Sequence, residues 1–220
     1  MRPTPGGAHV YAATMTTPSQ NSSPGADETA DRQQTAELME TVIRVIGDPQ
    51  VTHQQVMALS ESLGRNAVLF LTAMAAHAAQ IRVGQDLLDH ADRLTAEQRG
   101  WLPDPREIEK ALGTQPDAFT MAGAVHDSFG TITGKLLEQG DAEERHEAAH
   151  QAESLALLGA ALGGKEGQAR MAELSHEMGF EVAFSRLHAY FAMMVRQVSH
   201  VTGDDWATAV DRVAEQLRTA

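Results

Sequence analysis

Apolar residues recur at helical spacing from Thr35 to the end of the chain, and no stretch alternates apolar and polar residues as a half-buried strand does. Turn signals such as Gly47-Asp48-Pro49 and Gly163-Gly164 separate the apolar segments. Short connections between amphipathic helices favour antiparallel packing. The pattern therefore predicts an all-α fold, an antiparallel bundle of about six to eight helices, in a single helical domain over residues 35–220.

Capping residues mark the expected ends of several helices. Thr52 with Gln55, and Asp141 with Glu144, have the spacing of capping boxes, in which two side chains satisfy the first free amides of a helix. Asp204 stands just before the last apolar stripe. We expect helices to begin at these three places, the last one with Asp204 as its N-cap.

The two most apolar segments predict the centre of the core. One lies over about residues 65–83, and the other is the second half of a long helix expected over about residues 165–201. Residues 180–198 are hydrophobic around more than half of the helix circumference, which indicates a helix surrounded on several sides or one that buries a face in a partner. Met193 and Met194 would suit such an adaptable contact.

Residues 1–34 are rich in Pro, Gly, Ser, Thr and Asn and lack apolar periodicity, so we expect a disordered leader. The leader has no apolar run typical of a secretory signal, and Met15 is a plausible alternative start to Met1. The run from Ala67 to Ile81 is too short to span a bilayer, which favours a buried core helix. We expect a cytoplasmic protein.

Composition narrows the classes of function. The chain has 30 acidic and 17 basic residues and a formal net charge of −13, which argues against a sequence-independent nucleic-acid binder and against docking on anionic lipid. It has no cysteine, which excludes disulfides, thiolate zinc sites and cysteine nucleophiles. We therefore expect neither nucleic acid nor membrane as a partner.

One string has the form of a catalytic motif, His146-Glu147-Ala148-Ala149-His150. On a helix, histidines at i and i+4 can share a zinc ion, and the glutamate can act as general base on zinc-bound water. Over these five residues the string resembles the zincin metalloprotease motif. A helical wheel instead places both histidines opposite an apolar side made of Ala148, Leu155, Leu158 and Leu162. They fall among Glu143, Glu153 and Leu157 on a face dense in charge, so an ordinary solvated face is the alternative.

A helical hairpin that turns at Gly163-Gly164 would bring a second motif level with the H-E-x-x-H string along the helix axis. Glu147-x-x-His150 and Glu173-x-x-His176 are both E-x-x-H pairs, the unit that carboxylate-bridged di-metal bundles use twice. Further glutamates for a full di-iron set are lacking, so a mononuclear zinc site is the more plausible form. Its candidate ligands are His146, His150, Glu173 and His176, with Glu147 as the catalytic base if zinc is bound.

Three histidines, His77, His126 and His176, lie on apolar stripes. A neutral imidazole in a core usually satisfies both nitrogens with hydrogen bonds, and we expect this structural role for each. The alternative is that they converge on a metal or form a protonation switch.

These observations favour a non-enzymatic protein-interaction or regulatory protein that acts through helix–helix contacts, with a protein partner or as a homo-oligomer, and without a cofactor. The alternative is a metal-binding protein or a zinc-dependent hydrolase built on His146, Glu147 and His150 with Glu173 and His176.

Overall fold

The computed structural model describes residues 37–90, 92, 94 and 101–219, and over these residues the fold is all-α, as predicted. The predicted disordered leader, residues 1–34, lies outside the described residues. The described part contains nine helices, one more than the upper end of the expectation. They span residues 37–46, α2 (His53–Leu63), α3 (Arg65–His90), α5 (Pro105–Leu112), α6 (Ala118–Gln139), α7 (Ala142–Leu162), α8 (Gly164–Met178), α9 (Phe180–Thr202) and α10 (Trp206–Thr219).

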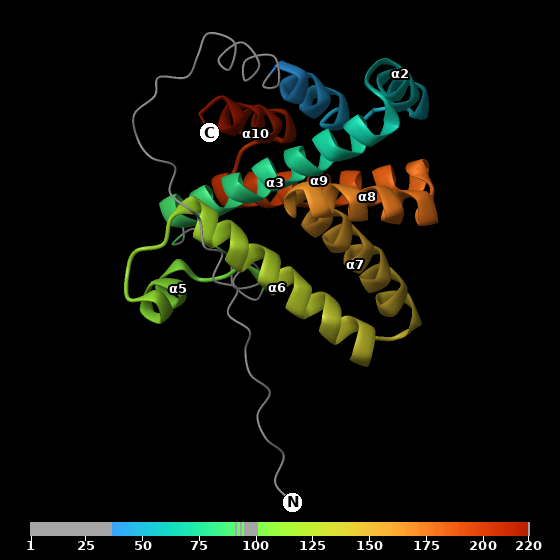
Figure 1. The fold of residues 1–220 in the computed structure, drawn as a ribbon. Helices are drawn as coiled ribbons and strands as arrows, with labels where there is room; N and C mark the ends of the chain where they lie inside the picture. The colour runs from blue at the N-terminus through green and yellow to red at the C-terminus, as the bar shows by residue number, and fades with distance from the viewer. Residues whose placement is uncertain (1–36, 91, 93, 95–100, 220) are drawn as a thin grey trace, which may run out of the picture.

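The central pair of helices, α3 and α9, runs parallel (Figure 1). At their starts, the guanidinium of Arg65 lies 5.5 Å from the ring centre of Phe180. At their far ends, α10 carries Arg212, which pairs with Asp204 just beyond α9 and lies close to Asp86 of α3. The predicted antiparallel arrangement describes chain neighbours such as α6 and α7, which are joined by a short turn, but not this central pair.

The two central helices, α3 and α9, pack on one another and bury side chains of different sizes. The buried face of α3 includes Ala75, Ala76 and Ala79, whereas α9 buries the large side chains of Leu187 and Phe191. Small residues on one helix let the bulky side chains of its neighbour pack closely. The prediction that these two segments form the centre of the core is confirmed.

The 26-residue helix α3 begins at Arg65, as expected, and continues beyond residue 83 to His90. By length and composition alone it could cross a membrane, although most of its apolar stretch is buried inside the bundle. The core helix of a soluble protein has the same composition, so the packing of α3 accounts for its apolarity, and the expectation of no membrane partner stays a prediction.

The predicted long helix over residues 165–201 is wrong, because Gly179 divides it into α8 and α9. Gly179 has φ 83° and ψ 147°, and Gly64 between α2 and α3 has φ 86° and ψ 141°, a conformation essentially restricted to glycine. The glycines end the similar strings Leu-Ser-Glu-Ser-Leu-Gly and Leu-Ser-His-Glu-Met-Gly. Ser60 and Ser175 each donate a hydroxyl hydrogen bond to the carbonyl three residues earlier. The α2–α3 and α8–α9 pairs are therefore two similar helix–glycine–helix units, 115 positions apart.

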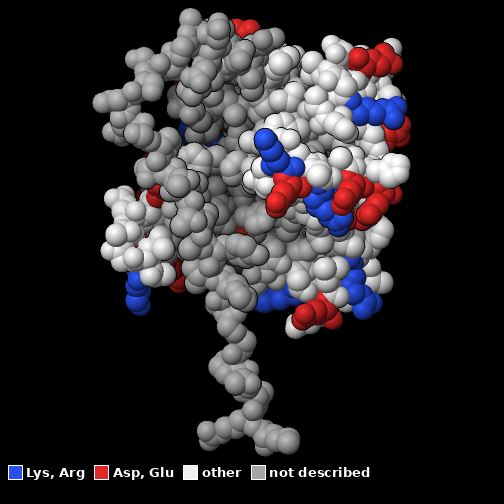
Figure 2. Space-filling view, in the orientation of Figure 1, with Lys and Arg blue, Asp and Glu red and all other residues white. Residues whose placement is uncertain are grey.

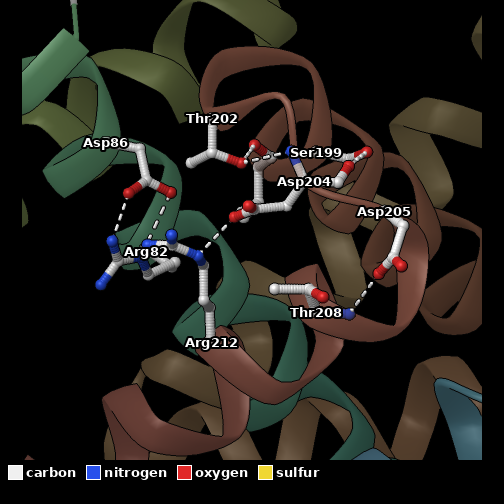
Figure 3. A network of polar contacts seen from close by, with 9 residues as sticks. Arg82, Asp86, Ser199, Thr202, Asp204, Asp205, Thr208 and Arg212 are labelled. Carbon is white, nitrogen blue, oxygen red and sulfur yellow. Dashed lines mark hydrogen bonds and ion pairs between the residues drawn. The ribbon is translucent and has the colours of Figure 1, made fainter.

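The helix α10 packs on α3 and on α9, and charged side chains of these elements lie near one another (Figure 3). Asp86 is fully buried and pairs with Arg82 one helical turn earlier. Burial raises the pKa of Asp86, while Arg82 and Arg212 act in the opposite direction. Arg212 Nε lies 2.5 Å from Asp204 Oδ2. Asp204 therefore links the segment after α9 to α10 instead of capping α10.

The predicted N-cap of the last helix is thus shifted by one residue. Asp205 Oδ1 accepts a hydrogen bond of 2.8 Å from the amide of Thr208, which lowers the pKa of Asp205. Both predicted capping boxes, at Thr52 and at Asp141, are confirmed.

Leu187→Ala should lower the free energy of unfolding by about 2–5 kcal/mol, because this side chain of α9 is fully buried and its truncation leaves a cavity. Val182→Ala on the same helix is the control. The Val182 side chain is 41% exposed, and the change should stay within about 0.5 kcal/mol. Chemical denaturation measures both, and equal effects would contradict the central position of α9.

Gly179→Ala should destabilise the fold by about 1–3 kcal/mol through backbone strain alone, since no atom lies within 4 Å of the added Cβ. Gly130→Ala in α6 is the matched control, because its Cβ also meets open space but its backbone is helical. That change should stabilise by about 0.5–1 kcal/mol. Stabilisation by both changes in thermal melts would show that the α8–α9 junction tolerates another conformation.

Candidate functional site

The H-E-x-x-H string lies on α7, whose first turn is capped by Asp141 and Glu144. The imidazole ring centres of His146 and His150 are 4.3 Å apart, with their planes inclined at 65°. His146 and Glu147 are exposed, and His150 is half-buried. The helical spacing therefore brings the two imidazoles together as predicted.

The neighbours of His150 come from α9. Ser154 shares its hydroxyl between the carbonyls of His150 and Arg186, each at 2.9 Å, and Arg186 Nε lies 2.6 Å from Glu153 Oε2. Partial burial, followed by the charge of Arg186, lowers the pKa of His150. The same guanidinium opposes the approach of a metal cation.

The second E-x-x-H pair does not join the first. Glu173 on α8 is exposed and forms an ion pair with Arg170, with Arg170 Nη1 3.0 Å from Glu173 Oε2. His176 is also exposed, and it lines a cavity with Arg65 and Phe180. Within residues 37–90, 92, 94 and 101–219, no group of three or more His, Asp and Glu side chains is arranged to hold a metal. Zinc binding by His146 and His150 stays a prediction, without a third ligand from α8.

The helical wheel of α7 is wrong in two places. Leu157, expected near the histidines on the solvated face, is fully buried, and Leu162, expected on the apolar side, is 42% exposed. The reason is that α7 packs against four helices, α3, α6, α8 and α9, rather than against one neighbour. Its apolar residues therefore do not form one stripe.

The histidines expected in the core have different surroundings. His77 is half-buried, and its Nδ1 is a buried atom without a hydrogen-bond partner among the described residues. Burial lowers the pKa of His77, His126 acts in the same direction, and Gln80 acts against it. The expectation of two satisfied nitrogens is therefore wrong for His77, and the expectation of a core position is wrong for His176, which is exposed.

A buried hydroxyl lies between α6 and α9. Tyr190 is 2% exposed, its ring packs edge-on against Phe129 at 6.5 Å, and burial raises the pKa of its phenol well above the ordinary value. No partner for this hydroxyl occurs in the part of the chain that the structure describes. Tyr190 and His77 thus leave two unsatisfied polar atoms in the interior.

Two grooves, which the sequence pattern does not predict, flank the start of α3 and α9. The α3/α8 groove consists of two adjoining cavities of about 340 and 360 Å³, which share Asn66, Leu69, Ala172 and Ser175. The α2/α9 groove encloses about 230 Å³. Phe180 lines both grooves and stands between them.

The grooves occupy equivalent places in the two helix–glycine–helix units. Each lies between the short helix of one unit and the first turns of the long helix of the other. Leu69 and Met171 of the first groove correspond to Phe184 and Val56 of the second at the same offset of 115 positions. The repeated Leu-Ser-x-x-Leu/Met-Gly string was the sequence signal that could have revealed this pairing.

No protein family, curated protein or solved structure matches this chain.

We expect the untagged protein to melt at the same temperature with and without a chelator. The described part of α7 offers two neighbouring imidazoles, and the adjacent charge is the cation of Arg186. Stoichiometric zinc in elemental analysis, lost in His150→Ala but kept in the exposed control His200→Ala, would contradict this expectation. It would support a hydrolase with Glu147 as base.

Proposed function

We propose that this protein is a non-enzymatic interaction protein that binds a helix of a partner protein in the α2/α9 groove. One observation carries the proposal, namely the composition of this groove. Val56 and Met57 of α2 face Phe180 and Phe184 of α9. Apolar side chains surrounded by a polar rim are typical of the centre of a protein interface.

The shape of the groove favours a helix as occupant. Its walls are the helices α2 and α9, which belong to different helix–glycine–helix units and leave a space between them. An amphipathic helix binds such a space with its apolar side chains at i, i+3, i+4 and i+7. The proposal therefore requires an amphipathic partner segment.

The charge around the groove favours a partner with basic residues. Glu181 and His53 lie on the rim, with His53 Nε2 3.9 Å from Glu181 Oε1, and both side chains are largely exposed. The whole chain carries a formal charge of −13, so a second copy would be repelled, whereas basic residues beside the apolar stripe would be attracted. In this proposal the protein works in the cytoplasm and needs no cofactor.

A photocrosslinking side chain at Met57, introduced into the full chain in its native cells, tests the proposal. Met57 is half-buried and lines the groove, whereas Phe119 on α6 is 60% exposed and lies outside it, which makes it the control position. We expect crosslinks at Met57 to a peptide with amphipathic helical spacing and flanking Lys or Arg. Glu181→Lys should weaken this capture without changing the melting temperature.

Equal capture at both positions, or a captured segment without helical periodicity, would contradict the proposal. A crosslinked product of twice the chain mass would identify a homo-oligomer instead of a partner protein.

A further inference from the structure

The α3/α8 groove differs from the α2/α9 groove in its chemistry. Its apolar lining comes from Leu69 and Phe70 of α3 and from Met171 of α8. The cavity of about 340 Å³ is within the range of small-molecule sites and is continuous with the second cavity, through shared lining residues, toward Arg65 and His176. One end of the groove is therefore apolar and the other is polar.

The polar end of this groove carries positive charge and no negative charge. Among the residues that the structure describes, Arg65 is the only one with a fixed charge that lines either of the two cavities. Within the described residues Arg65 forms no ion pair, and its guanidinium lies over the ring of Phe180. On the face drawn in Figure 2, acidic and basic side chains lie interspersed, in contrast to the lining of this groove.

The side chains nearest the groove in sequence explain why no carboxylate neutralises Arg65. Glu173, on the same helix as Met171, pairs with Arg170. The first turn of α3 contains no acidic residue, and Asn66 occupies the position beside Arg65. Among the acidic residues of the described part of the chain, none lines this end of the groove.

We propose that the α3/α8 groove binds a small amphiphilic carboxylic acid, with its carboxylate at Arg65 and Asn66 and its hydrocarbon tail along Leu69, Phe70 and Met171. The guanidinium and the carboxamide donate hydrogen bonds to the carboxylate. Burial of the tail against the apolar lining supplies the remaining affinity. The inference concerns a different groove from the proposed function and does not depend on it.

The equivalent α2/α9 groove provides an internal comparison. At the offset of 115 positions, Glu181 takes the place of Asn66 and Ser185 takes the place of Phe70. A carboxylate at the rim repels an anionic ligand, and a serine shortens the apolar lining. The amphiphilic anion should therefore distinguish the two grooves.

Isothermal titration of the full chain with decanoate, with decylamine as the probe of opposite charge, tests this site. We expect one decanoate per chain and much weaker binding of decylamine. Arg65→Gln should weaken decanoate binding at least tenfold, because a charge-assisted hydrogen bond is lost, and Arg65→Lys should retain most of it. Glu181→Gln in the other groove is the matched control and should leave decanoate binding unchanged.

A second variant tests the position of the tail. Ala172 is exposed and lines both cavities of the groove, so Ala172→Trp should fill the groove and abolish decanoate binding while the core stays intact. Thermal melts of the free variants verify that each one folds. No binding of decanoate, equal binding of decylamine, or decanoate binding that survives both Arg65→Gln and Ala172→Trp would overturn the proposal. None of these outcomes bears on crosslinking at Met57.

Discussion

The packing of the alanine-rich face of α3 against the bulky face of α9 is the contact on which the rest of the structure depends. The helix α3 buries small side chains such as Ala75, Ala76 and Ala79, α9 buries Leu187 and Phe191, and the two helices pack on one another. All the other long helices pack on one or both members of this pair. Only 5% of the residues in the chain are aromatic. Close packing of the helices therefore supplies much of the van der Waals contact that aromatic side chains would otherwise provide.

Two glycines determine how the shorter helices are placed around that pair. Gly64 and Gly179 adopt nearly the same left-handed conformation, and each turns the chain between a short helix and a long one within a single residue. Because α3 and α9 are parallel, the two turns come to the same end of the molecule, where Arg65 meets Phe180. The two grooves are a geometric consequence, since each short helix leaves its own long helix and faces the start of the other one.

The same geometry separates the residues of the metal hypothesis. The face of α7 that carries His150 contacts Arg186 of α9. On α8, Glu173 instead pairs with Arg170 and His176 lines the α3/α8 groove. The two E-x-x-H pairs were expected to lie level along the axes of a helical hairpin. Such a position is not enough to bring their side chains into one site. The rotation of each helix about its own axis decides which side chains meet, and this rotation follows from packing on α9.

The sequence by itself determined the helical class, the capped starts at Thr52 and Asp141, and the two segments that form the centre of the core. These features depend on the spacing of nearby residues and on side chains that form hydrogen bonds with the backbone of the same helix. They can therefore be recognised directly in the amino-acid sequence. Only the tertiary structure decided that α3 and α9 are parallel, that Leu157 is buried while Leu162 is exposed, and that Arg65 lines a groove without a carboxylate. The physical reason is that helical periodicity shows which face of a helix is apolar, but neither which helix covers it nor in which direction that helix runs.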